Sequence, residues 1–203
     1  MRRQTYFKGV GDNRGFWRKA ALLLGGIMVA VLFTGYQRPL VSAQQPINVA
    51  VLDFSAANIT QTTYAGTVSR YAADDLAAQL AHVSNVTVIS RKSVNDAAAS
   101  MGWKMPADLV NFDRLAQLAQ NVGANYLFVG RVQSINAPGG GGGAATTATV
   151  QIALFDAAAK SNLGTATGNG LAGTTGGRDV AVRGALHNAN AKALAALKAK
   201  LPH

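Results

Sequence analysis

The hydrophobic positions of residues 46–123 form short β-branched runs and longer runs with a period near four. The short runs at 46–54 (PINVAVLDF) and 85–90 (NVTVIS) predict two strands, and the first is hydrophobic enough to be buried on both faces. Residues 62–83, between them, predict a long amphipathic helix, because hydrophobic side chains recur at every fourth position. These side chains are Tyr64, Val68, Ala72, Leu76 and Leu80.

Two more helices are predicted after the second strand. Residues 91–101 form a short alanine-rich segment that is expected to end at Gly102, because glycine readily adopts the left-handed conformation that closes a helix. A further helix is expected to begin with Asp108 as its N-cap and to close at Gly123. One face of this helix is hydrophobic and consists of Phe112, Leu115, Leu118, Ala119 and Val122.

The remaining pattern predicts three strands and a final helix. The strands are expected at 125–135, 145–155 and 163–171, and the helix at 178–201. The middle strand alternates between hydrophobic and polar residues, as a half-buried antiparallel strand does. Five consecutive glycines, Gly139–Gly143, predict a loop tip between the first two of these strands.

The order β-α-β-α-α-β-β-β-α defines the expected fold. Its first half has the crossover connections of parallel strands, and its second half has those of an antiparallel meander. We therefore predict the α/β (α+β) class, with a mixed parallel and antiparallel sheet of about five strands packed with helices. The strands at 145–155 and 163–171 are rich in Thr, Ala and Gly, so one of them is expected at a sheet edge.

The first 43 residues have the order of a secretory signal peptide. A basic segment, 1–19, precedes the hydrophobic run 20–33, and the small-residue site Val41-Ser42-Ala43 follows. Cleavage after Ala43 leaves 44–203 as a single domain, whereas an uncleaved leader would act as a membrane anchor. The 14-residue run spans about 21 Å as a helix, less than the roughly 30 Å hydrocarbon core, which favours cleavage. Either outcome predicts a periplasmic or extracellular domain that contacts the membrane only through this segment.

Charge and cysteine content narrow the function classes. The formal net charge is +10, and the leader holds seven of the 19 basic residues and one of the nine acidic residues. The other residues carry 12 basic and 8 acidic groups, a net charge of +4 that is dispersed along the chain and argues against nucleic-acid binding. The chain has no cysteine, which excludes disulfides, thiol catalysis, thiolate metal sites and a lipidated cysteine.

Several segments resemble one family in their order along the chain. They are VAVLDF at 49–54, VISRKSVNDAAASMG at 88–102, NVGANYLFVGRV at 121–132 and the alanine-rich C-terminal helix. Together they resemble the periplasmic domain of the curli-assembly CsgG/HfaB family, and they are also similar to the N-terminal domain of TolB and to lipoprotein activators of penicillin-binding proteins. The resemblance covers nearly all of residues 46–201. It implies a cell-envelope domain that packs against neighbouring subunits.

Two departures from that family bear on pore formation. CsgG-type channels are anchored through a lipidated cysteine, which this chain lacks. They also insert long amphipathic hairpins into the outer membrane, and the one candidate here, 131–155, has the glycine run at its centre. A membrane strand needs about 9–11 residues with an alternating, lipid-facing pattern. The resemblance therefore implies the globular domain.

One motif has the form of a nucleotide-binding loop. Residues 168–173 (GNGLAG) match GxGxxG, in which the glycines sit at a strand-to-helix turn and an acid ends the next strand. Only a helix is predicted after this match, so no second strand and no ribose-binding acid can follow. We predict a glycine-rich strand or turn here instead of a cofactor site.

The acidic residues and histidines do not have catalytic or metal-binding spacing. Asp53 ends the first predicted strand, where α/β sites often lie, but no second carboxylate is singled out. Asp74 and Asp75 are expected on the solvated face of the long helix, and Asp113 has no assigned partner. The histidines His82, His187 and His203 are isolated, and His187 is expected at the surface.

Tyr64 and Tyr71 are one to two helical turns apart, a spacing that fits a core stripe and also a binding face, and we favour the core. We therefore predict no catalytic, cofactor-binding or metal-binding residue, and no cofactor. The predicted function is a non-enzymatic binding or assembly module in secretion, cell-surface fibre or cell-wall machinery. Its expected partner is an envelope protein or a second copy of the chain. An outer-membrane pore and an extracytoplasmic enzyme of unrecognised type are the alternatives.

Overall fold

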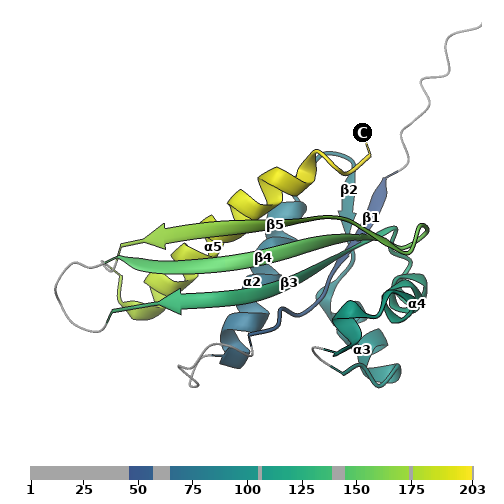
Figure 1. The fold of residues 1–203 in the computed structure, drawn as a ribbon, viewed down its shortest axis with the longest axis horizontal. Coiled ribbons are helices and arrows are strands. Elements are labelled where there is room, and N and C mark those ends of the chain that lie inside the picture. The colour runs from purple at the N-terminus through teal and green to yellow at the C-terminus, as the bar shows by residue number, and fades with distance from the viewer. Residues whose placement is uncertain (1–45, 57–64, 105–106, 139–144, 174–175, 203) are drawn as a thin grey trace, which may run out of the picture. The chain divides into compact units, whose positions relative to one another are not determined.

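The computed structural model describes residues 46–56, 65–104, 107–138, 145–173 and 176–202. In these residues the strands and helices follow one another in the predicted order, which confirms the α+β class (Figure 1). The elements are β1 (Ile47–Val51), α2 (Ala65–Leu80), β2 (Val86–Val88), α3 (Arg91–Ser100), the 3-10 helix η1 (Ala107–Val110), α4 (Phe112–Val122), β3 (Tyr126–Asn136), β4 (Thr146–Asp156), β5 (Ser161–Ala172) and α5 (Arg178–Lys198). The leader, Tyr64, Gly139–Gly143 and His203 lie outside the described residues.

The strands form one mixed sheet in the order β2-β1-β3-β4-β5. β1 pairs in parallel with β2 and with β3, because helical crossovers return the chain to the same end of the sheet. β3, β4 and β5 pair antiparallel, with a register shift between Val132 and Ser134. β5 therefore lies at an edge, which confirms the prediction that a Thr-, Ala- and Gly-rich strand ends the sheet.

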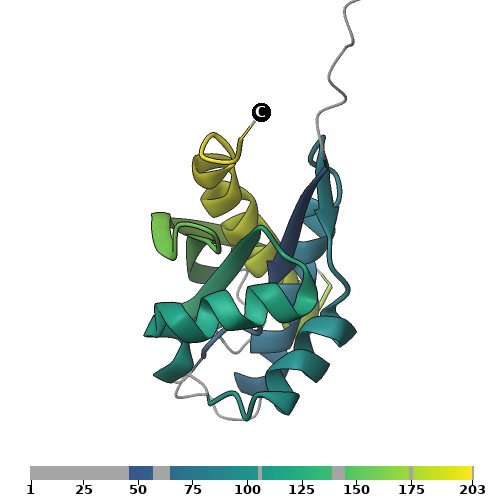
Figure 2. The same ribbon diagram turned by 90° about the vertical axis from the view of Figure 1, so that its right-hand side faces the viewer.

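Helices cover the two faces of the sheet to different extents. α2 and α5 pack on the first face, where Val51, Phe128 and Ile152 are fully buried. α3 and α4 pack on the second face, at the end of the sheet where β3 begins, and they enclose Leu52 and Leu127 (Figures 1 and 2). Each face therefore has its own hydrophobic core.

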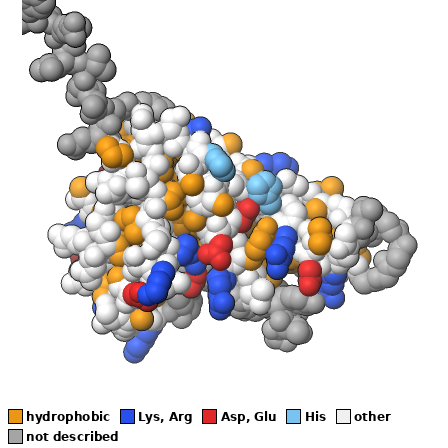
Figure 3. All heavy atoms as spheres, turned by 180° about the vertical axis from the view of Figure 1, so that it is seen from behind, with side chains coloured by type: hydrophobic (Ala, Val, Ile, Leu, Met, Phe, Trp, Pro, Cys, Tyr) orange, Lys and Arg blue, Asp and Glu red, His pale blue; other side chains and the backbone are white. Residues whose placement is uncertain are grey.

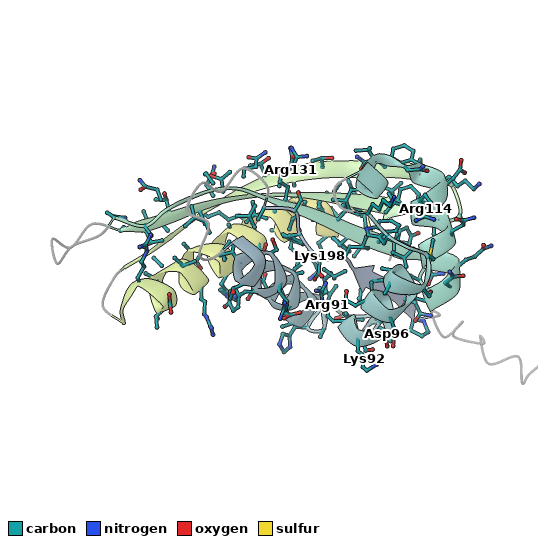
Figure 4. The ribbon with its side chains drawn as sticks, turned by 90° about the horizontal axis from the view of Figure 1, so that it is seen from below. Arg91, Lys92, Asp96, Arg114, Arg131 and Lys198 are labelled. Carbon is teal, nitrogen blue, oxygen red and sulfur yellow. The ribbon has the colours of Figure 1, made fainter. Side chains whose placement is uncertain are left out.

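Beyond α4, most exposed side chains on the second face of the sheet are polar, and Leu171, opposite Thr147, is an exposed hydrophobic exception. Thr147, Thr165, Thr167 and Asn169 are exposed there, on β4 and β5. Figure 4 shows Arg131 of β3 on the same side, directed away from α2 and α5. We call this surface the polar sheet face and define it by Arg131, Thr147, Thr149, Gln151, Thr165, Thr167 and Asn169.

Helix ends follow local hydrogen bonding, and one predicted cap is wrong. Asn111, not Asp108, caps α4, because its side-chain oxygen accepts from the backbone N–H of Arg114 at 3.1 Å. Asp108 belongs instead to η1, the short 3-10 helix before that cap. Gly123 closes α4 as predicted, with a left-handed φ of 73° that a side chain rarely adopts.

Candidate functional site

The GxGxxG residues lie within β5 and just after it, which confirms the prediction of a glycine-rich strand. A Cβ on Gly168 would come within 2.8 Å of the Ala189 carbonyl carbon and would overlap its oxygen. A Cβ on Gly170 would overlap the Ala185 carbonyl oxygen in the same way. The two glycines therefore allow the backbone of α5 to pack directly on β5.

The prediction that Asp75 is solvated is wrong. Its side chain is only 10% exposed, because it faces α5. The amides of Gln79 and Asn190 each donate to Asp75 Oδ2 at 2.8 Å, and the Nδ1 of His187 lies 2.8 Å from Asp75 Oδ1. Acidic, basic and histidine side chains gather on this side of the molecule (Figure 3). We call Asp75, Gln79, His187 and Asn190 the interhelical polar cluster.

The cluster joins α2 to α5 by hydrogen bonds, of which the one from Asn190 to Ala72 is buried. Asn190 is fully buried, and its amide also donates to the Ala72 carbonyl at 2.8 Å. His187 was predicted to be a surface residue, and its side chain is 55% exposed but is held by Asp75. Buried amides of this kind are costly when a partner is lost, so the cluster fixes how the two helices pack.

Replacing Asp75 with alanine is expected to lower the free energy of unfolding by about 2 kcal/mol, because the buried Asn190 amide loses an acceptor. Asp74→Ala is the matched control from the same helix, since the Asp74 side chain is 53% exposed and pairs with Arg91. Its expected cost is less than about 1 kcal/mol. Urea denaturation measures both values, and equal losses would show that Asp75 is no more structural than Asp74.

Arg91 forms ion pairs with two acidic residues, Asp53 and Asp74, for which the sequence indicated no partner. Its guanidinium forms an ion pair with Asp53, lies 3.0 Å from Asp74 and donates to the Val51 carbonyl at 2.8 Å. Figure 4 shows Arg91 between α2 and α3. Because the Arg91 side chain is only 15% exposed, this set ties the end of β1 to both helices. Asp53 therefore has a packing role at the position where a catalytic acid had been considered.

The other candidates do not converge on one site. Asp113, in the first turn of α4, pairs with Lys160 at 2.9 Å. His82 is exposed after α2. Tyr71 is half-buried against the first core, as predicted, and Arg183 lies 5.1 Å from its ring centroid. Burial and the nearby Asp75 carboxylate raise the pKa of Tyr71 above its ordinary value.

The described residues hold neither a metal-type cluster of side chains nor a helix suited to span a membrane. Among them there is no group of three or more His, Cys, Asp or Glu side chains placed to hold a metal ion. Over the same ranges, no helix is both long enough and apolar enough to cross a membrane.

The edge strand β5 has an unusual composition for an exposed edge. Its 12 residues include no charged residue and no proline, the residue types that commonly protect such edges from pairing. Leu171, near its end, is 60% exposed. Asn188 of α5 donates to the Leu171 carbonyl at 2.9 Å, so α5 takes up one carbonyl near the end of the strand. The sequence predicted an edge strand but could not say which of the two candidates it is.

No protein-family model matches this chain, and no curated protein matches it either. Several solved structures are similar to it. The lipoprotein GNA1162 from Neisseria meningitidis is 15% identical, with a TM-score of 0.53, and the similarity covers 68% of this chain and 90% of that one. At this identity the likeness shows a shared fold alone.

Two further structures are similar at lower scores. The PelC dodecamer from Paraburkholderia phytofirmans is 17% identical with a TM-score of 0.44, and the match covers 75% of this chain and 88% of that one. The C-terminal domain of LpoB from Salmonella enterica is 15% identical with a TM-score of 0.41, over 64% and 85% of the two chains. The resemblance to the CsgG/HfaB family is not shown by these comparisons and stays a prediction.

Proposed function

We propose that this chain is an exported, non-enzymatic binding or assembly module of the cell envelope. The leader supports export, with a mature form that begins at Gln44 and a single domain over 44–203. The fold shared with the lipoprotein GNA1162 is compatible with an envelope role. In its finer form the proposal is a CsgG-like module that serves secretion, cell-surface fibre or cell-wall machinery.

The observation that carries the proposal is the uncharged edge of β5. An edge strand offers unpaired N–H and C=O groups to another chain, and this one lacks the charges or prolines that discourage pairing. Strand addition of this kind supplies affinity through backbone hydrogen bonds. The module therefore acts by adding a strand to its sheet.

A second copy of the chain is the partner that fits this edge best. Two β5 strands can pair antiparallel about a two-fold axis, so that each edge satisfies the other. The exposed residues on β5 are uncharged, as Thr165, Thr167 and Asn169 illustrate, so identical edges meet without charge repulsion. Such a dimer would join two five-stranded sheets into one.

The proposal is tested in cells by expressing the full chain in a bacterial host with a photo-crosslinking group at the β5 edge. The crosslinker must not react with amines, because the variants add lysines. We expect the crosslinked species to be found outside the cytoplasm, with an N-terminus at Gln44 by mass spectrometry. Thr167→Lys is expected to reduce crosslinking, because two lysines would meet at the pairing edge. The matched control is Thr147→Lys, which adds the same charge on the interior strand β4.

Three outcomes would contradict the proposal. A chain that stays in the cytoplasm contradicts export. Equal crosslinking in the two lysine variants contradicts edge pairing. Ion conductance after addition of the chain to liposomes would instead support the alternative of a pore.

A further inference from the structure

The hydrogen bonds of β3 show in which direction each residue of β4 presents its backbone groups. Ala157 donates to the Asn125 carbonyl at 3.0 Å, so these two residues form a hydrogen-bonded antiparallel pair. Such pairs alternate along antiparallel strands, so the odd-numbered residues of β4 bond to β3. Gly130 and Val132 of β3 bond in the opposite direction, to Ser55, which agrees with this alternation. The even-numbered residues of β4 therefore present their N–H and C=O groups to β5.

The register between β4 and β5 then identifies the free edge of β5. Between positions 164 and 172, the even-numbered residues of β5 are paired with even-numbered residues of β4, so they bond to β4. The odd-numbered residues present their N–H and C=O groups to the outer edge of the sheet. They are Thr165, Thr167, Asn169 and Leu171. Their side chains lie on the second face of the sheet, because the glycines between them face α5.

One group on this edge is already bonded within the chain. Asn188 of α5 donates to the outward-facing Leu171 carbonyl at 2.9 Å. Among the described residues, no side chain bonds to the outward backbone groups of Thr165, Thr167 or Asn169. At the other end, the regular pairing of β5 with β4 begins only at position 164. The edge that is open to another strand therefore runs from 165 to 169, and Thr167 is its midpoint.

Two β5 edges that meet about a two-fold axis have few registers to choose from. Outward-facing residues have to pair with outward-facing residues, so only odd-numbered positions can pair across the axis. With the axis at Thr167, this residue pairs with its own copy, and Thr165 pairs with Asn169 of the partner subunit. Every outward N–H and C=O group from 165 to 169 is then bonded.

Registers shifted toward Leu171 are less favourable for two reasons. With the axis between 167 and 169, the N–H group of Thr165 meets a Leu171 carbonyl that Asn188 already occupies, and this happens once in each copy. The shift also places Leu171, which is 60% exposed, opposite a threonine. With the axis at Thr167, uncharged polar side chains of the polar sheet face are opposite one another instead.

We propose that β5 pairs with a second copy in a single register, with Thr167 on the two-fold axis, and that Asn188 selects this register by occupying the Leu171 carbonyl. The inference rests on the proposed function, because it assumes that two β5 edges pair. It adds the position at which the copies meet and a residue outside the strand that determines this position. Asn188 is a positioning residue, since it acts by closing one end of the open edge.

Single-cysteine variants of the purified exported chain locate the axis, because the natural chain has no cysteine to form other disulfides. The Cα atoms of a hydrogen-bonded antiparallel pair are about 5.5 Å apart, within disulfide range. In the proposed register, two copies of position 165 or of position 169 are four residues apart along the strands, roughly 13 Å and out of range. We expect Thr167→Cys to form the linked dimer about tenfold faster than Thr165→Cys or Asn169→Cys. A mixture of the last two variants is expected to link to each other faster than either links to itself.

Asn188→Ala tests the positioning role, because it frees the Leu171 carbonyl for a partner strand. In this background, Asn169→Cys is expected to link to itself about threefold faster than in the natural chain, since shifted registers become available. Lys198→Ala is the matched control, because Lys198 is also exposed on α5. It should leave the relative linking rates unchanged.

The possible failures of this inference and of the proposed function are distinguishable. A chain that stays monomeric and forms no linked dimer at any of the three positions contradicts edge pairing, and the register with it. Dimers that link fastest at Thr165 or Asn169, or equally at all three positions, contradict the register while edge pairing stands. Unchanged relative rates in the Asn188→Ala background would overturn the role of Asn188.

Discussion

Gly168→Ala is expected to lower the free energy of unfolding by about 3 kcal/mol, and Gly170→Ala by a similar amount. A methyl group at either position would overlap a carbonyl oxygen of α5, from Ala189 or Ala185. Backbone atoms cannot turn aside as a flexible side chain can, so α5 would have to move away from the sheet. That movement would open the first core, in which Leu186 and Leu197 of α5 are buried.

Gly164→Ala is the matched control on the same strand. A methyl group there would come within 2.7 Å of Lys200, but of the far end of its flexible side chain. The expected change is within about 0.5 kcal/mol. Thermal or urea denaturation of the three variants measures the difference. Equal stabilities would show that α5 does not rest on the backbone of β5.

Gly130→Ala is expected to cost about 3 kcal/mol for a different reason. The ring of Phe54, which is 1% exposed, lies directly over Gly130, and an added methyl group would overlap its outer atoms. The ring is enclosed in the first core and has no free space into which to turn. Chemical denaturation of the single variant measures this cost.

Phe54→Leu is expected to relieve the overlap in a double-mutant cycle. Alone, it should cost about 1–2 kcal/mol because the core loses part of the ring volume. With Gly130→Ala, the total cost should be smaller than the sum of the two single costs, because the shorter side chain leaves room for the methyl group. Strict additivity would contradict a direct contact between these two residues.

Much of the fold was accessible from the sequence because hydrophobic periodicity is a local property. The strand of residues 145–155, with hydrophobic and polar residues alternating, is β4. The final helix buries Leu186, Ala189 and Leu197, as its pattern implies. The prediction of Asp108 as the N-cap of α4 was wrong. Asp108 and Asn111 are three positions apart and both residue types can cap a helix, and only the position of η1 before α4 selects Asn111.

The contacts that join distant segments could not be predicted in this way. Asp75 and His187 are 112 positions apart, and the helical period of α2 placed Asp75 off the hydrophobic stripe without revealing that α5 covers it. The glycine spacing at 168–173 indicated a glycine-rich strand or turn. That the backbone of α5 packs against these glycines is visible only in the structure.

Sedimentation velocity of the purified exported chain, over a concentration series and with detergent as a second condition, tests the central claim most directly. We expect a mass above that of the monomer that rises with concentration, persists in detergent, and is reduced to the monomer by Thr167→Lys but not by Thr147→Lys. A strict monomer at every concentration would contradict self-association through β5.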